Sequence, residues 1–119
     1  MKLLTLNTHS LIEPDYEAKR EHFVNFIAAE QPEVFALQEV NQTAAAPLLG
    51  EIPAGYFPCP GNGVPLKADN HAAAVARMLE KRGVQYHWSW LPAKIGYDKY
   101  DEGMAVFSRA PITAAKICC

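Results

Sequence analysis

The chain has 119 residues, half of them apolar, and its 11 Lys and Arg against 13 Asp and Glu leave a formal net charge of −2. The apolar content excludes a chain that is disordered by composition, and the length fits a single domain. The charge argues against a strongly basic nucleic-acid-binding surface, although it is compatible with nucleic acid as the substrate of a metal-dependent enzyme.

Three predicted elements open the chain, namely a strand over residues 2–8, a helix over 16–30 and a second strand over 33–39. Apolar side chains at alternating and intervening positions of the first strand indicate burial on both of its faces. In the helix, Phe23, Phe26 and Ile27 recur at helical spacing, so we expect them to face the core. This succession is typical of a βαβ unit, although an antiparallel return of the second strand fits the same pattern.

Each of these two strands ends in an oxygen ligand for a hard metal ion, which is Asn7 in the first and Glu39 in the second. Ligands of open α/β sheets gather beyond the carboxyl ends of the strands. Amide and carboxylate oxygens are also the ligands that Mg²⁺ prefers. If the strands are neighbours, the two side chains converge on one cation; the simpler interpretations are a turn cap for Asn7 and a solvated carboxylate for Glu39.

The rest of the chain predicts a long loop, a second helix and three further strands. Pro and Gly recur through residues 44–67, which indicates a loop with a functional or mobile role. The later elements are a helix over 70–82, a strand over 85–91, a polar loop over 96–103, a strand over 104–109 and a fifth strand over 112–118. Asp69 or Asn70 is the expected N-cap of the second helix, and Gly83 stands where a C′ glycine belongs.

Cysteine usage and the start of the chain bear on the compartment. Cys59, Cys118 and Cys119 form no Cys-x-x-Cys pair and no zinc-binding spacing. An odd number with two adjacent is unlike a disulfide framework, so we expect a reducing, cytoplasmic location. The apolar run at the start is too short for a signal peptide, and no stretch approaches the roughly 20 apolar residues of a membrane helix.

Four motifs follow one another along the chain: Leu6-Asn7-Thr8-His9, Leu37-Gln38-Glu39-Val40, Tyr100-Asp101-Glu102-Gly103 and Val106-Phe107-Ser108-Arg109-Ala110-Pro111-Ile112. In this order and spacing they resemble the endonuclease/exonuclease/phosphatase superfamily, which includes the pancreatic-type deoxyribonucleases. The third motif looks most like that of bacterial members. The resemblance implies an α/β fold, namely the N-terminal half of a two-sheet, deoxyribonuclease-like α/β sandwich with a mixed sheet and helices on its outer face.

The resemblance also implies a hydrolase of phosphate esters, of the phosphodiesterase, nuclease or phosphatase type, with Mg²⁺ as cofactor and Mn²⁺ as the alternative. Glu39 matches the family residue that binds the ion, and Asn7 matches the one that orients a metal-bound water, the ion or the phosphate. Further candidates for substrate contacts, each with an ordinary packing, surface or ion-pair interpretation beside it, are His9, Tyr97, Tyr100, Glu102 and Arg109. The substrate is left open among nucleic acid, sugar phosphate, inositol phosphate and phospholipid head group.

The chain departs from the family in its length. Complete members are longer, and their catalytic His, their Asp-x-Asn and their terminal Asp-His pair come later in the sequence. We therefore expect residues 1–119 to be one partial domain without its C-terminal half, with little activity of its own and a tendency to bind the missing segment or itself. The alternative is a non-catalytic α/β binding module, or a fragment that requires a partner segment.

Overall fold

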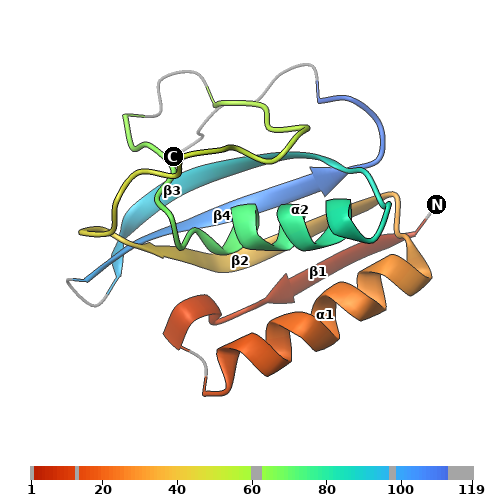
Figure 1. The fold of residues 1–119 in the computed structure, drawn as a ribbon, viewed down its shortest axis with the longest axis horizontal. Helices are drawn as coiled ribbons and strands as arrows, with labels where there is room; N and C mark the ends of the chain where they lie inside the picture. The colour runs from red at the N-terminus through yellow and green to blue at the C-terminus, as the bar shows by residue number, and fades with distance from the viewer. Residues whose placement is uncertain (1, 13, 60–62, 97–98, 113–119) are drawn as a thin grey trace.

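The computed structural model describes residues 2–12, 14–59, 63–96 and 99–112 (Figure 1). In chain order these residues form β1 (Leu3–Asn7), the 3₁₀ helix η1 (Ser10–Ile12), α1 (Tyr16–Glu30), β2 (Val34–Thr43), α2 (His71–Lys81), β3 (His87–Gly96) and β4 (Tyr100–Ser108). None of the helices in this part of the chain combines the length and the apolar composition that crossing a lipid bilayer requires.

The four strands form one mixed sheet in the order β1-β2-β4-β3. β1 and β2 run parallel, with α1 as the crossover between them, whereas β4 is antiparallel to both of its neighbours. The α/β class, the mixed sheet and the βαβ start are therefore confirmed, and the antiparallel return is excluded. Because β1 and β2 are parallel neighbours, Asn7 at the end of β1 lies beside Gln38 of β2.

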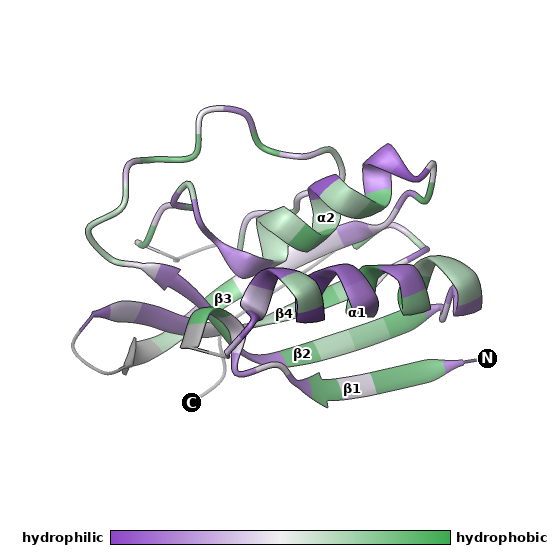
Figure 2. Ribbon diagram, turned by 60° about the horizontal axis from the view of Figure 1, so that its bottom comes forward, coloured by the Kyte–Doolittle hydropathy of each residue, from purple (hydrophilic) through white to green (hydrophobic). Residues whose placement is uncertain are grey.

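Both helices pack on the same face of the sheet, and the core lies between them and the strands (Figures 1 and 2). An aromatic row crosses three strands in register, with Phe35 on β2, Phe107 on β4 and Trp88 on β3. The rings of Phe35 and Phe107 are stacked with centroids 4.5 Å apart, and those of Phe107 and Trp88 are stacked at 5.9 Å. All three side chains are fully buried, so this row is the centre of the core.

Two predictions about burial are wrong. β1 is not buried on both faces, because Leu3 is 69% and Leu6 42% exposed. β1 is an edge strand, and both helices lie over one face of the sheet, so its side chains have few neighbours. Phe26 does not face the core either: Val24 and Ile27 take the inward positions of α1, while Phe26 lies on the outer side of the helix and is 51% exposed.

β2 and β4 are longer than the sequence predicts. β2 continues past Glu39 to Thr43, and β4 begins at Tyr100, because the two strands pair with each other over these extra residues. Residues 100–103, for which the sequence predicts a loop, therefore lie within the sheet. Glu39 is consequently inside a strand and not at its end.

β3 is also longer than expected. It continues through Pro92 to Gly96, with an irregularity of register just after the proline. Proline is tolerated here because β3 is the other edge strand of the sheet. Of the predicted fifth strand, residues 113–118 lie outside the described residues.

Gly103 allows β4 to lie close to β3. A Cβ atom at position 103 would come within 2.3 Å of the Leu91 carbonyl oxygen, which is far inside van der Waals contact. Gly103 also pairs across β4 and β2 with Val40, the residue after Glu39. The glycine of the Tyr-Asp-Glu-Gly motif thus serves close strand packing beside the candidate site.

The long loop before α2 is anchored by the buried side chain of Gln42. Its Nε2 donates to Pro65 O (2.9 Å) and Asp101 Oδ2 (3.0 Å), and its Oε1 accepts from Lys67 N (2.7 Å) and Asn70 Nδ2 (2.9 Å). Asn70 is the N-cap of α2 and accepts a hydrogen bond from the Ala73 N–H, as predicted from the sequence. The C-terminal end of β2 therefore fixes both the loop and the start of α2.

Candidate active site

The backbone of β2 is irregular at Glu39. The pairing of β2 with β4 shifts register between Leu37 and Val40, which makes Glu39 part of a β-bulge. Glu39 has a φ angle of +54°, in the left-handed region. This conformation costs a residue other than glycine about 1–2 kcal/mol. Bulges and strained residues of this kind are over-represented at functional sites, where they re-aim a side chain.

The chain directly after β1 shares this strain. His9 and Ser10 have φ angles of +52° and +50°. Thr8 ties the two irregular segments together, because its N–H donates to Gln38 O at 3.1 Å and its Oγ1 lies 3.3 Å from Glu39 O. Two strained segments from neighbouring strands are thus held side by side.

The structure brings Asn7, His9 and Glu39 together. The His9 N–H donates to Asn7 Oδ1 at 3.1 Å, and the His9 ring has its Nδ1 3.4 Å from Glu39 Oε2. His9 therefore bridges the carboxamide and the carboxylate that the sequence pairs as metal ligands. The candidate ligands lie on two adjacent strands, Asn7 at the end of β1 and Glu39 within β2.

The Glu39 carboxylate has one buried oxygen, which lies beside the His9 ring. Its Oε2 is buried and makes no hydrogen bond within the described residues, because the approach of His9 Nδ1 at 3.4 Å is an ion-pair distance without hydrogen-bond alignment. Burying a carboxylate oxygen without a partner is costly unless a cation compensates it. Among the described residues no cluster of three His, Cys, Asp or Glu gathers around a point. One carboxylate and one amide are nonetheless a fitting donor set for Mg²⁺, which keeps several waters.

The remaining predicted residues lie at different distances along the sheet. Glu102 is buried and pairs across the sheet with Asn41, two residues beyond Glu39, so it lies near the candidate site. Tyr100 pairs further along with Thr43, and the Lys99 Nζ lies 5.4 Å from its ring centroid.

Arg109 is not brought to the candidate site. Its backbone N–H donates to Glu33 O, just before β2 begins, and its side chain is exposed. Val34 pairs with Ser108, so Arg109 lies beside the start of β2, away from Glu39. Tyr97 lies outside the described residues.

Sequence reasoning missed two buried polar residues beside the site. The Ser10 Oγ accepts the Asn41 N–H at 3.0 Å, which joins η1 to β2 just past the bulge. Asn41 is fully buried, and neither polar atom of its carboxamide makes a hydrogen bond within the described residues. No sequence pattern indicates this burial, because Asn41 follows the predicted end of the strand at Glu39.

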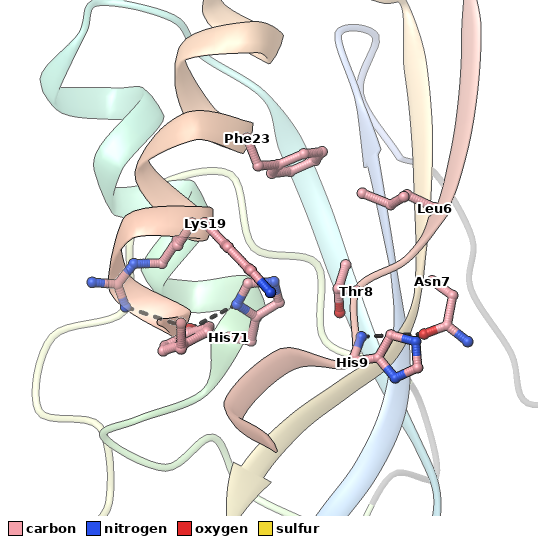
Figure 3. Close-up of a pocket in the computed structure, with 9 residues that line it drawn as sticks. Leu6, Asn7, Thr8, His9, Lys19, Phe23 and His71 are labelled. Atoms are coloured by element: carbon pink, nitrogen blue, oxygen red, sulfur yellow. Dashed lines mark hydrogen bonds between the residues drawn. The ribbon is translucent and has the colours of Figure 1, made fainter. Parts of the chain in front are cut away.

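A cavity of about 190 Å³ adjoins the candidate site on the helix side of β1 (Figure 3). It lies between the end of β1, the first turns of α1 and the start of α2. Its lining residues are Leu6, Asn7, Thr8, His9, Tyr16, Lys19, Arg20, Phe23 and His71. Asn7 and His9 therefore border both the cavity and the Glu39 carboxylate.

A hydrogen-bonded chain of three side chains forms one wall of this cavity. Arg20 Nη1 donates to Tyr16 Oη at 3.4 Å, and Tyr16 Oη lies 2.7 Å from His71 Nδ1. Burial, with a smaller contribution from the Arg20 charge, lowers the pKa of His71 to about 4. Burial also raises the pKa of Tyr16. At neutral pH the Tyr16 hydroxyl therefore shares its hydrogen bond with a neutral imidazole.

Comparison with known proteins places the chain in a family. The family model for the endonuclease/exonuclease/phosphatase family matches residues 4–117. The chain belongs to this family. No curated protein matches the sequence.

Two solved structures share the fold. An endonuclease/exonuclease/phosphatase family protein from Leptotrichia buccalis C-1013-b is 30% identical and superposes with a TM-score of 0.79 over 96% of this chain. An endonuclease/exonuclease/phosphatase from Beutenbergia cavernae DSM 12333 is 21% identical, with a TM-score of 0.59 over 97% of this chain. The chain spans 39% and 27% of the lengths of these two proteins.

Proposed function

We propose that this chain forms part of a Mg²⁺-dependent hydrolase of phosphate esters, in which Glu39 and Asn7 hold the ion. Membership of the family supports the phosphoesterase class. The bulge at Glu39 is the observation that carries the metal assignment: a strained backbone holds the carboxylate beside Asn7, and one buried carboxylate oxygen has no hydrogen bond within the described residues. Mn²⁺ is the alternative ion.

Each residue has a defined task in this proposal. A bound Mg²⁺ supplies positive charge for the oxygens of the phosphate ester. Glu39 binds the ion through its carboxylate, and Asn7 orients the ion, its water or the phosphate through the carboxamide. His9 holds both side chains in place, through its N–H to Asn7 and its ring beside Glu39. Thr8 fixes the distance between the two strand segments.

Metal binding is the direct test of the assignment. We expect Mn²⁺ to broaden the backbone NMR signals of His9 and Val40 selectively. Glu39→Gln removes the only charge of the proposed donor set, so we expect it to weaken Mn²⁺ binding at least about tenfold.

Glu30→Gln is the matched control. Glu30 is an exposed carboxylate at the far end of α1 whose ion pair is with Lys2, so Mn²⁺ binding should be unchanged. Equal affinity in both variants, or broadening centred away from β1 and β2, would show that the ion does not bind at Glu39.

Catalysis by the chain alone is a separate matter. The family resemblance assigns the water-activating Asp and His to a later part of the domain, and the chain spans 39% of the Leptotrichia protein. We therefore expect the 119-residue chain by itself to hydrolyse phosphate esters slowly or not at all. An assay with bis(p-nitrophenyl) phosphate and Mg²⁺ checks this: turnover that Glu39→Gln abolishes would contradict it. The comparisons give no support to the alternative of a non-catalytic module.

A further inference from the structure

Two residues of β2 hold most of the buried polar atoms that lack a hydrogen bond. In the part of the chain that the structure describes, five buried side-chain nitrogen and oxygen atoms have no hydrogen-bond partner, and three of them belong to Glu39 and Asn41. They are Glu39 Oε2 and both polar atoms of the Asn41 carboxamide. Leaving such groups buried and unpaired costs stability. Their concentration in one place therefore indicates a functional role, such as binding an ion.

Both side chains point away from the apolar core. Leu37 and Val40 lie in the core on the helix side of the sheet, so the bulge between them places Glu39 outside it. Gln42 also faces the helix side, where its side chain anchors the loop before α2. Side chains along a strand alternate between the two faces. Asn41, which lies between Val40 and Gln42, therefore takes the opposite face and is the next polar group beyond Glu39 there.

The same face carries Asn7. Gln38 precedes the bulge, and its Nε2 donates to Thr5 Oγ1 on β1 at 2.8 Å. Asn7 pairs in register with Gln38 and is two positions from Thr5, so the three side chains share the face away from the helices. In Figure 3 the Asn7 carboxamide points away from α1. Asn7, Glu39 and Asn41 thus present two carboxamides and a carboxylate to one side of the sheet.

The backbone from Glu39 to Asn41 is held by β3 and by η1. The Trp90 Nε1–H donates to Val40 O at 3.0 Å, and the Asn41 N–H donates to Ser10 Oγ at 3.0 Å. With the backbone fixed in this way, rotations about side-chain bonds alone determine whether the two side chains meet. The Asn41 Nδ2 carries two N–H donors and the Glu39 carboxylate is an acceptor, so the two groups are complementary.

We propose that Asn41 is a positioning residue of the candidate metal site: its Nδ2 donates a hydrogen bond to the Glu39 carboxylate and holds that carboxylate toward the cation. The inference rests on the proposed function for the presence of the cation. Hydrogen-bond partners of a ligating carboxylate fix its orientation, and their loss typically weakens metal binding by about 10- to 100-fold. Without the cation Asn41 destabilises the fold, because its carboxamide is buried without a hydrogen bond among the described residues.

The test measures Mn²⁺ affinity and stability for two variants of the 119-residue chain. Asn41→Leu keeps the approximate volume of the side chain and removes its polar atoms. We expect it to weaken Mn²⁺ binding at least about tenfold and to raise the urea midpoint of unfolding. Ser89→Ala is the matched control. It removes another buried group without a hydrogen bond among the described residues, on β3, which β4 separates from β2. Its Mn²⁺ affinity should equal that of the wild type.

A second measurement follows the carboxamide directly. In an NMR titration of the wild type with Mg²⁺, we expect the side-chain NH₂ signals of Asn41 to shift together with the backbone signal of Val40, because the hydrogen bond to Glu39 forms as the ion binds. The NH₂ signals of Asn25, an exposed asparagine of α1, should stay in place.

The outcomes separate this inference from the proposed function. A loss of Mn²⁺ affinity in Asn41→Leu but not in Ser89→Ala, together with the shift of the Asn41 NH₂ signals, supports the inference. Mn²⁺ binding that Glu39→Gln weakens and Asn41→Leu does not overturns the inference and leaves the proposed function intact. A wild type that binds no Mn²⁺, or binds it as tightly after Glu39→Gln, overturns both.

Three further results overturn the inference alone. Equal losses of affinity in Asn41→Leu and Ser89→Ala would show a general effect of core substitutions. Asn41 NH₂ signals that stay in place during the Mg²⁺ titration would show that the carboxamide does not meet the ligating carboxylate. A lower urea midpoint for Asn41→Leu would show that the carboxamide stabilises the fold and does not serve the cation.

Discussion

Phe107→Ala is expected to lower the free energy of unfolding by about 3–5 kcal/mol. Phe107 is fully buried at the middle of the aromatic row, stacked on Phe35 on one side and on Trp88 on the other. Its removal leaves a cavity bordered by two large rings on different strands, which the sheet holds at fixed separation. Urea denaturation followed by far-UV circular dichroism measures the loss.

Phe26→Ala is the matched control for this prediction. Phe26 is the same residue type but lies 51% exposed on the outer side of α1. Its truncation should cost less than about 1 kcal/mol, because much of its surface already contacts water. Comparable losses for the two variants would mean that the aromatic row is not the centre of the core.

The second large effect is a loss of folding stability at acidic pH. His71 has its pKa lowered to about 4 by burial in the folded chain, against 6.5 when unfolded. Between these values the unfolded chain binds the extra proton, so stability falls as the pH falls from about 6.5 to about 4 and does not change further through this group. The shift corresponds to about 3 kcal/mol of stability that is fully present above pH 6.5.

Carboxylates also titrate in this pH range, so the contribution of the His71 imidazole is isolated by difference. The stability difference between the wild type and His71→Gln should shrink by about 3 kcal/mol between pH 7 and pH 4. His22→Gln, which replaces an exposed histidine of α1, is the matched control for the loss of a histidine side chain. Parallel curves for the wild type and His71→Gln would refute the buried neutral state.

The sequence predicts well those features that depend on residues close together in the chain. The bounds of α1 match the helix predicted over 16–30, and the start and end of α2 follow from Asn70 and Gly83, whose roles are local. The pairing of Asn7 with Glu39 also rests on local pattern, since each follows an apolar strand segment, and their role as metal ligands stays a prediction. Their convergence needed only the parallel pairing of neighbouring strands.

The features that escaped prediction depend on contacts between distant residues. The extension of β2 to Thr43 requires β4 as a partner, about sixty positions later in the chain. The cavity wall joins Tyr16 to His71, which are 55 positions apart. Phe26 has the same hydropathy as an inward residue, and only the position of α1 over the edge of the sheet turns it outward.

The bulge at Glu39 also limits which insertions and deletions this part of the sequence can tolerate. Leu37 and Val40 are both fully buried although three positions separate them. The extra residue of the bulge therefore determines which face of the sheet each later side chain of β2 occupies. A point substitution there alters one side chain. An insertion or deletion between these two residues would instead rotate Val40 out of the core and swing Gln42 away from the loop it anchors. The number of residues in this short segment is thus a stronger constraint than the identity of most of them.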